Sequence, residues 1–504
     1  MKNWLRVLSF ILFLAMAVAA FAACGSSTTD SDKDKDKETS GKPADGEKTT
    51  ESETEANKPK SALDVFLDDY KSDYTNREFT IAVFPDDASM IWRDVDWLAE
   101  DYTGDTINDA VYERNKTVEE MLGITITAIP QSEYAGIQEI TNGISSGNST
   151  YDALNITCKN AFSAAQGEYL RELHEFGEID IDAAWWDANV LNDMSIGGQN
   201  YILTGDINTM YKKSIAVIMF NKRVINDIDL TGIGNPYELR DSMNWTIENM
   251  VEMGSLFSND VDSNDTYDEH DQYGLIYFCN MAATAMIGAG TRFVTKNEDD
   301  IPELTFYSED TVDILDELST LLYDRSLAWS WSAAGLNENT AFTMFKADQS
   351  LFYYGELHAV AEMRAMDSPF GIMPMPLLDD AQDQYHHSIN PDVAAVIVVP
   401  ADAPDDKFTG EVLDCIAAAS RDLLTPAYYE QNLQGKVSRD EESRETLDIV
   451  ITTINYDIGY LSIPDIASML NSMANSRSKD LASKYSSSES SIQKALDDIV
   501  EKFS

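Results

Sequence analysis

The stretch Phe79-Thr-Ile-Ala-Val-Phe84 opens the folded part of this chain and decides its class. It is short, apolar and partly β-branched, and Pro85-Asp-Asp87 follows it, which predicts a buried strand that ends in a loop. A helix is expected over residues 106–121, and apolar runs at 124–129 and 151–156 predict two more strands. Because such alternation is typical of parallel sheets, the chain is predicted to be an α/β protein.

The middle and the end of the chain continue this pattern. Residues 215–220 predict a strand, Asn244 is expected to cap a helix that runs to Gly254, and Ser308 is expected to cap another helix. Further strands are expected at 351–354, 370–373 and 393–399, and successive helices from about residue 408 to the end.

The N-terminus has the pattern of an export signal. Lys2 and Arg6 precede an apolar segment at 7–20, and Phe21-Ala-Ala23 supplies small residues just before Cys24. This pattern resembles a bacterial lipoprotein signal, so the first 23 residues are expected to be removed and Cys24 to carry lipid. The protein would then be anchored to the cell membrane on its extracytoplasmic face. Cleavage without acylation, or an uncleaved helix anchor, is the alternative.

The composition is strongly acidic. The 504 residues carry a formal net charge of −52, which becomes −54 without residues 1–23, because these hold two basic and no acidic side chains. Such a field repels phosphate backbones and anionic lipid, so no nucleic acid is expected to bind and the membrane is expected to be reached through the lipid anchor only. Residues 24–60 are almost entirely small or polar and predict a disordered linker.

The roughly 440 residues after position 60 are more than one hydrophobic core usually holds, which predicts two lobes. Beyond Cys24 the chain has Cys158, Cys279 and Cys415. Because three cysteines cannot pair completely, a disulfide framework is not expected, and the three are predicted to be small buried apolar residues.

Five segments resemble, in order along the chain, motifs of the solute-binding lipoproteins of ABC importers, the family related to maltose-binding protein. They are Phe220-Asn221-Lys222, Pro236 with Asn244-Trp245-Thr246, residues 341–346 with 351–355, residues 370–376, and residues 393–400 with the helix expected at 408–420. The resemblance implies the two-lobed type II periplasmic-binding-protein-like fold. Each lobe would be a mostly parallel sheet flanked by helices, with a hinged cleft between the lobes.

The same resemblance implies how the chain is divided and what it does. Lobe one would hold residues 76–205 with 377–421, and lobe two would hold 210–372 with 426–504, joined by crossings near 203–210, 373–376 and 421–426. A small solute, an oligosaccharide in the first instance, would bind between the lobes and pass to ABC permease subunits. The receptor is expected to be a monomer, and the only cofactor considered is a structural calcium ion.

Side chains that line the cleft are expected in loops at the carboxyl ends of strands. The aromatic and polar candidates are Trp92, Asp96, Trp97, Asn160, Asp206, Tyr211, Trp329, Trp331, Tyr354, Glu356, Asn390 and Asp392. Aromatic faces stack on sugar rings while carboxylates and amides bind hydroxyl pairs, but the same lining suits an amine through cation–π contact and carboxylate pairing. Core packing for each aromatic residue, and a solvated position for each acid, stay open.

One departure weakens the prediction of a carbohydrate ligand. Gly355 is followed by Glu356-Leu-His358, where related sugar binders often carry a tryptophan.

One acidic loop has the spacing of a calcium site. Asp260, Asp262, Asn264, Asp268 and Asp271 stand at positions 1, 3, 5, 9 and 12 of an EF-hand-like loop, and Ca²⁺ prefers such oxygen ligands. Asp265 replaces the usual glycine and Asp271 the usual glutamate, so a solvated acidic loop is the alternative.

Catalytic motifs are weak in this sequence. Gly143-Ile-Ser145-Ser-Gly147 has the spacing of a nucleophile elbow without a strand before it, and it predicts a surface turn. The adjacent His386 and His387 would point to opposite sides of an extended chain and could not bind one metal together. No enzyme activity is therefore expected. A secreted glycan-active hydrolase and a surface adhesin are the alternatives to a binding receptor.

Overall fold

The computed structural model describes residues 59–85, 96–131, 137–147, 150–177, 179–433 and 441–503. Cys24, nearly all of the linker predicted at 24–60, and Trp92 lie outside the described residues. Within the described part, the strands form a four-stranded sheet, a five-stranded sheet and a two-stranded hairpin.

The four-stranded sheet contains the strand with which the folded part of the chain begins. Its members are β1 (Glu78–Val83), β2 (Thr125–Pro130), β3 (Ala153–Thr157) and β11 (Ala395–Val398), in the order β11-β3-β1-β2. β1 runs parallel to β2 and β3, and β11 runs antiparallel to β3. The three strands predicted from the first apolar runs are thereby confirmed. β3 and β11 are buried along their whole length, as expected for strands covered on both faces.

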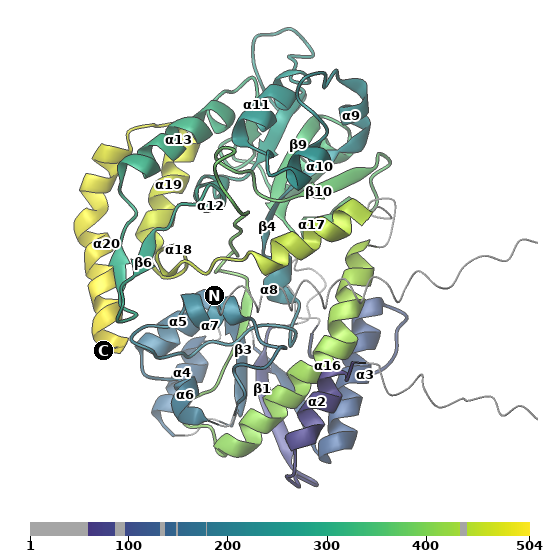
Figure 1. The fold of residues 1–504 in the computed structure, drawn as a ribbon, viewed down its shortest axis with the longest axis vertical. Helices are drawn as coiled ribbons and strands as arrows, with labels where there is room; N and C mark the ends of the chain where they lie inside the picture. The colour runs from purple at the N-terminus through teal and green to yellow at the C-terminus, as the bar shows by residue number, and fades with distance from the viewer. Residues whose placement is uncertain are drawn as a thin grey trace, which may run out of the picture. The chain divides into compact units, whose positions relative to one another are not determined.

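Seven helices of the described residues belong to the same part of the chain as this sheet. They are α2 (Ala62–Asp69), α3 (Thr106–Leu122), α4 (Ile137–Ser145), α5 (Cys158–Gln166), α6 (Leu173–Phe176), α7 (Ala188–Asp193) and α16 (Asp406–Leu433). α3 begins where the Asp105 carboxylate accepts the backbone N–H groups of Ile107 and Asn108, and it ends at Gly123, which adopts a φ of 69°. α2 and α3 pack against α16 (Figure 1).

The five-stranded sheet is built from the middle of the chain. Its members are β4 (Ala216–Asn221), β5 (Tyr273–Tyr277), β8 (Ala328–Ser330), β9 (Ser350–Glu356) and β10 (Phe370–Met373), in the order β10-β4-β9-β5-β8. β5 is parallel to β8 and β9, whereas β4 is antiparallel to both of its neighbours. The protein is thus a mixed α/β structure: two of the three strand pairs in the four-stranded sheet are parallel, and so are two of the four pairs in the five-stranded sheet.

Further helices and a hairpin belong to the middle and the end of the chain. The helices are α8 (Met210–Lys213), α9 (Lys222–Asp227), α10 (Pro236–Asp241), α11 (Ile247–Ser255), α12 (Met281–Gly288), α13 (Glu309–Leu322), α14 (Glu338–Lys346), α15 (Ala359–Met363), α17 (Glu441–Thr452), α18 (Ile458–Ser462), α19 (Pro464–Ser476) and α20 (Leu481–Phe503), and the hairpin joins β6 (Val294–Lys296) to β7 (Pro302–Leu304). Ser308 caps α13, as predicted. The predicted helices of the C-terminal region are also present.

Two local predictions are corrected. Thr246, not Asn244, caps α11, because Trp245 and Thr246 stay extended where they pair with Leu377, and the Thr246 hydroxyl then accepts the N–H of Asn249. The elbow-like segment at 143–147 is not a turn alone, because its first three residues form the last turn of α4.

Among the described residues, the chain passes from one sheet to the other between β3 and β4 and between β10 and β11. It passes a third time after α16, to α17, which packs against β10. The second passage is held by the Trp245 indole N–H, which donates to the Pro374 carbonyl (3.0 Å). In the third, α16 continues as one helix through Pro426.

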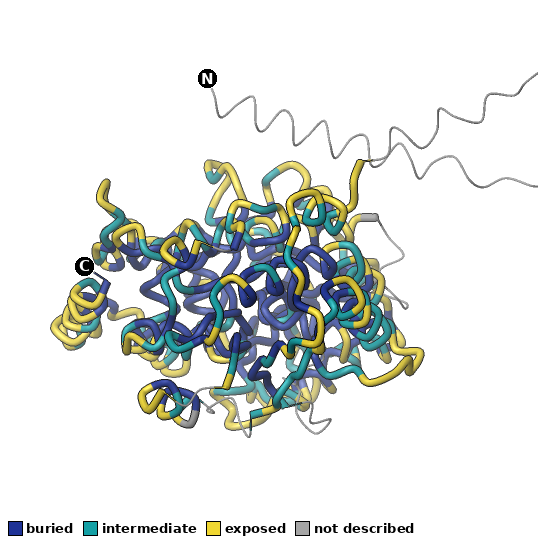
Figure 2. Tube along the Cα trace, turned by 90° about the horizontal axis from the view of Figure 1, so that it is seen from below, coloured by how far each residue is buried: buried dark blue, intermediate teal, exposed yellow. Residues whose placement is uncertain are grey.

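Apolar residues of both sheets and their helices fill the interior, whereas the outward turns of the helices are exposed (Figure 2). Cys158, Cys279 and Cys415 are free thiols buried in this interior, as the sequence predicted. Within the described residues, no helix has both the length and the apolar character needed to cross a bilayer.

Candidate functional site

Segments that leave the two sheets meet at one place, and we call their polar side chains the junction cluster: Lys159, Asn280, Glu356, His358, Asn390 and Asp392. Lys159 opens α5 directly after β3, and Asn280 follows β5. Glu356 ends β9, His358 comes two residues later, and Asn390 and Asp392 precede β11. The Asn390 amide donates to the Glu356 carboxylate (3.0 Å), and the Lys159 ammonium pairs with Asp392 (2.7 Å). The cluster therefore joins residues of both sheets.

Glu356 is the central carboxylate of the junction cluster. Only 8% of it is exposed. It accepts hydrogen bonds from Asn390 and Asn280, and its second oxygen lies 3.6 Å from Nδ1 of His358. Burial raises the pKa of Glu356 to about 7, although His358 and the two amides lower it. Near neutral pH this side chain can therefore either accept a hydrogen bond as a carboxylate or donate one as an acid.

His358 connects Glu356 to a second carboxylate. Its Nε2 lies 3.3 Å from Glu338, which also accepts the hydroxyl of Tyr353 at 3.4 Å. The close packing of Tyr353 depends on Gly355, since a Cβ there would lie 2.5 Å from the Tyr353 ring. The Glu-Leu-His segment that stands in place of the family's tryptophan therefore supplies two members of the cluster.

Two aromatic side chains lie side by side at the ends of β5 and β8. The rings of Phe278 and Trp331 are stacked with centroids 4.5 Å apart and an interplanar angle of 19°. The Trp331 indole N–H is buried and has no hydrogen-bond partner. Trp329 differs, because it lies in the core, 6% exposed, with its ring 6.1 Å from that of Tyr273. Of the two tryptophans, Trp331 has the open polar group that a ligand could use.

Two further predicted residues lie next to the junction cluster. Tyr354 is buried in β9 directly before Gly355, and its hydroxyl shares a hydrogen bond with Thr284 (2.9 Å). Asn160 stands beside Lys159 in the first turn of α5, where its backbone N–H donates to the Thr157 hydroxyl (3.2 Å). Five of the predicted residues thus lie within or beside the cluster: Asn160, Tyr354, Glu356, Asn390 and Asp392. Trp331 contacts Phe278, which precedes Asn280 by two residues.

Four predicted residues form a second group, at the first crossing between the sheets. The Asp96 carboxylate accepts the N–H and the hydroxyl of Thr209 (2.6 and 2.7 Å), and Trp97 is buried with the Arg114 guanidinium 4.9 Å from its ring centroid. Asp206 and Tyr211 lie on the same crossing. All four have structural partners there, so the predicted ligand-binding residues fall into two separate groups rather than one.

Asp206 links the first crossing to the third. Its carboxylate accepts hydrogen bonds from Arg421 (2.8 Å) and Thr425 (2.6 Å) of α16, and it lies 3.7 Å from the buried ammonium of Lys212. Burial lowers the pKa of Lys212, while Asp206 and Asp96 raise it. The Lys212 ammonium also stands 5.1 Å from the ring centroid of the buried Tyr211. These contacts tie together two of the three chain segments about which the sheets could move.

Sequence reasoning missed Asn280, Lys159 and His358 as site residues. Asn280 follows the apolar run of β5, which is the same signal that singled out Asn160 after β3. The run YGLIYFC at 273–279 would have predicted that strand. Lys159 could not be recognised as a site residue from the sequence, because its ion-pair partner Asp392 is 233 positions away along the chain.

The acidic loop at 260–271 brings three of its five predicted ligands together. Asp260, Asp262 and Asp271 each place one carboxylate oxygen within 4.8 Å of the others. Asp265 has a φ of 60°, the left-handed conformation for which the EF-hand uses glycine. Asp268 lies outside this group and accepts the N–H of His270, while the Asn264 amide donates to Asp262 (2.8 Å).

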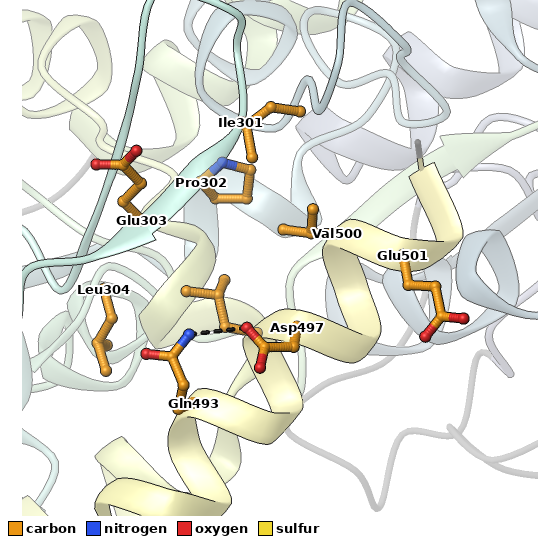
Figure 3. Close-up of a pocket in the computed structure, with 9 residues that line it drawn as sticks. Ile301, Pro302, Glu303, Leu304, Gln493, Asp497, Val500 and Glu501 are labelled. Carbon is orange, nitrogen blue, oxygen red and sulfur yellow. Dashed lines mark hydrogen bonds between the residues drawn. The ribbon is translucent and has the colours of Figure 1, made fainter.

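Two recesses occur elsewhere on the surface. One, of about 550 Å³, lies between β7 and α20, where Pro302 and Leu304 face Val500 and Asp497 (Figure 3). The other, of about 610 Å³, lies at the start of α11 and is lined by the carboxylates of Glu248, Asp313, Glu317, Asp379 and Asp380. Neither recess is lined by any of the residues predicted to bind a ligand.

Comparison with known proteins identifies the fold. No family model matches the chain, and no curated protein matches its sequence. Among solved structures, an extracellular solute-binding protein from Staphylococcus aureus in complex with maltose is 12% identical, with 85% of this chain and 98% of that chain covered and a TM-score of 0.55. The ABC substrate-binding protein Lmo0181 from Listeria monocytogenes in complex with cycloalternan is 14% identical (84% and 98% covered, TM-score 0.51).

A third similar structure is UgpB from Mycobacterium tuberculosis in complex with glycerophosphocholine, which is 16% identical (77% and 95% covered, TM-score 0.53). All three comparisons cover nearly the whole of the other chain. The chain therefore has the two-lobed, periplasmic-binding-protein-like fold of ABC solute-binding proteins.

Proposed function

We propose that this protein is the solute receptor of an ABC importer, which captures a small solute between its lobes and delivers it to a permease. The junction cluster carries this proposal, because it gathers carboxylates and amides at the ends of strands from both sheets. Ligands of two-lobed α/β proteins bind at such places. Movement of one sheet relative to the other would form or break contacts such as Asn390 to Glu356.

An oligosaccharide is the first solute class to test. Proteins with this fold have been crystallised with maltose and with cycloalternan. The stacked pair of Phe278 and Trp331 offers an aromatic surface for a sugar ring, and the indole N–H of Trp331 offers a donor for a hydroxyl. Capture would require no covalent chemistry and no catalytic residue.

The experiment is a thermal-unfolding screen of the purified protein against mono- and oligosaccharides, amino acids, peptides and polyamines, with product analysis of each mixture. A solute that binds only the folded state must raise the melting temperature. A saccharide that does so and is recovered unchanged supports the receptor. Turnover of an oligosaccharide, abolished by replacement of one carboxylate, would instead indicate a hydrolase. Binding to cell-wall polymer with no effect of small solutes would indicate an adhesin.

We also propose that residue Cys24 carries the lipid that holds the receptor, as a monomer, on the extracytoplasmic face of the cell membrane. The signal-like segment before it and the polar composition of residues 24–60 support this location. A flexible tether would keep the receptor near its transporter while leaving its orientation free. Mass spectrometry of the mature N-terminus tests this directly. A mature chain with an unmodified thiol at Cys24 would refute it.

A structural calcium ion in the loop at 260–271 is a separate proposal, supported by the three neighbouring carboxylates and by the conformation of Asp265. Calcium should raise the melting temperature of the wild-type protein relative to a chelator, since an ion that binds the folded state stabilises it. Asp262→Asn should reduce the shift, whereas Asp310→Asn, which changes an exposed carboxylate of α13, should not. An equal shift with magnesium, or none with calcium, would contradict the proposal.

A further inference from the structure

Glu356 is a buried carboxylate that contacts no lysine or arginine of the described part of the chain. Among the described residues, its partners are the amides of Asn390 and Asn280 and the imidazole of His358. The one lysine of the junction cluster, Lys159, is engaged by Asp392 at 2.7 Å. Burial of a carboxylate without a cation is unfavourable, which is the main reason that the pKa of Glu356 is raised. A cation that entered the cluster would remove this cost.

Hydrogen-bond acceptors also exceed donors at this place. Asn280 is only 8% exposed, and its buried Oδ1 atom has no hydrogen-bond partner. The NH₂ group of the same Asn280 side chain donates to Glu356, so the Asn280 oxygen without a partner lies close to the carboxylate. Glu338 adds a second carboxylate through His358. A buried acceptor without a donor costs free energy until a ligand supplies the donor.

Aromatic rings complete this environment. Phe278 is two residues before Asn280, and its ring stacks on Trp331. Burial is the main reason that the pKa of the Tyr460 hydroxyl is raised, and the nearby carboxylates of Glu356 and Asp392 raise it further. Aromatic faces attract cations, most strongly when water is excluded.

We infer that the captured solute carries a protonated amine, which binds the Glu356 carboxylate and the free oxygen of Asn280. This inference rests on the proposed receptor function and names the chemistry of its solute. An ammonium group supplies a positive charge for the Glu356 carboxylate and hydrogen-bond donors for the Asn280 oxygen. The amine can belong to an amino sugar or to a polyamine, and a titration with a solute of each kind distinguishes these sources.

The test is a calorimetric titration of the whole protein with four probes: the glucosamine trimer, the N-acetylglucosamine trimer, maltotriose and spermidine. The first two differ only by acetyl groups that remove the positive charge. The glucosamine trimer or spermidine should bind at least about tenfold more tightly than both neutral sugars, because a buried charge pair contributes this much or more. Which of the two binds identifies the source of the amine.

Three variants make the titration specific. Glu356→Gln keeps the shape of the side chain and should weaken binding of the amine probe about tenfold or more. Asn280→Ala, which removes the free acceptor, should also weaken it. Glu252→Gln, an exposed carboxylate of α11, changes the net charge equally and should leave the affinity unchanged. Equal binding of neutral sugars, or an amine affinity that Glu356→Gln and Asn280→Ala leave intact, would overturn the inference while receptor function stands. No binding of any probe would count against both.

Discussion

At the scale of single residues, Glu356 has the property that most clearly separates this site from ordinary core. Its folded-state pKa of about 7 lies above the usual value of 4.5. Between these values the folded protein keeps a proton that the unfolded chain has lost, so Glu356 makes the fold less stable as pH rises from 4.5 to 7. A buried carboxylate with such a shift contributes on the order of 2–3 kcal/mol to this loss.

Glu356→Gln removes this titration, so the variant should gain stability relative to wild type as pH rises through that window. The measurement is urea unfolding of both proteins at several pH values. Glu252→Gln on α11 is the control and should follow the wild-type profile. Parallel profiles for wild type and Glu356→Gln would show that the carboxyl group keeps its usual pKa.

Trp331 is the second residue for which the account makes a sharp prediction. Trp331→Ala should weaken the affinity for the captured solute about tenfold or more, because an aromatic anchor typically contributes more than about 1 kcal/mol. Trp331→Phe keeps a ring against Phe278 and should retain most of the affinity. If calorimetry gives the same dissociation constant for Trp331→Ala and wild type, Trp331 packs against Phe278 without contacting the solute.

At the scale of elements, the strands were the most predictable part of this molecule. Several of their apolar runs are buried along nearly their whole length, so the run itself is the signal, as at 79–84 and 393–399. The start of α11 could not be predicted from the local sequence in the same way. Trp245 and Thr246 are held extended by Leu377, more than 100 positions along the chain, and this pairing decides where the helix begins. Local signals therefore located the elements, whereas distant contacts set some of their ends.

The contact of the first crossing with α16 is the element-level feature that should control stability. Asp206→Ala would leave the Lys212 ammonium buried without its nearest carboxylate, and should cost about 3 kcal/mol of unfolding free energy. Arg421→Ala removes a half-exposed partner and leaves Asp206 with Lys212 and Thr425, so it should cost about 1 kcal/mol or less. Urea midpoints with unchanged slopes measure both losses. Equal losses would mean that Lys212 does not depend on Asp206.

At the scale of the whole molecule, the sequence predicted the fold class, and the structural comparisons support it at 12–16% identity. The assembly of the site was less predictable. Glu356 and Asn390 were both candidates, but nothing local indicated that they bond to each other or that Lys159 is engaged by Asp392. Likewise, Asp96 and Asp206 were predicted by the same criterion as the cluster residues, but they accept hydrogen bonds from Thr209 and from α16 at the first crossing. Residue type indicated only that these side chains are polar, and only the fold could separate the residues of the junction cluster from those at the crossing.

The central claim is that a small solute is captured between two lobes that close on it. Small-angle X-ray scattering of the purified protein, with and without the solute that raises its melting temperature most, tests this directly. Hinge closure brings the two lobes together, so the account predicts a smaller radius of gyration at saturation and no change with a solute that does not bind. An unchanged radius at saturation, or the absence of any stabilising solute, would contradict the claim.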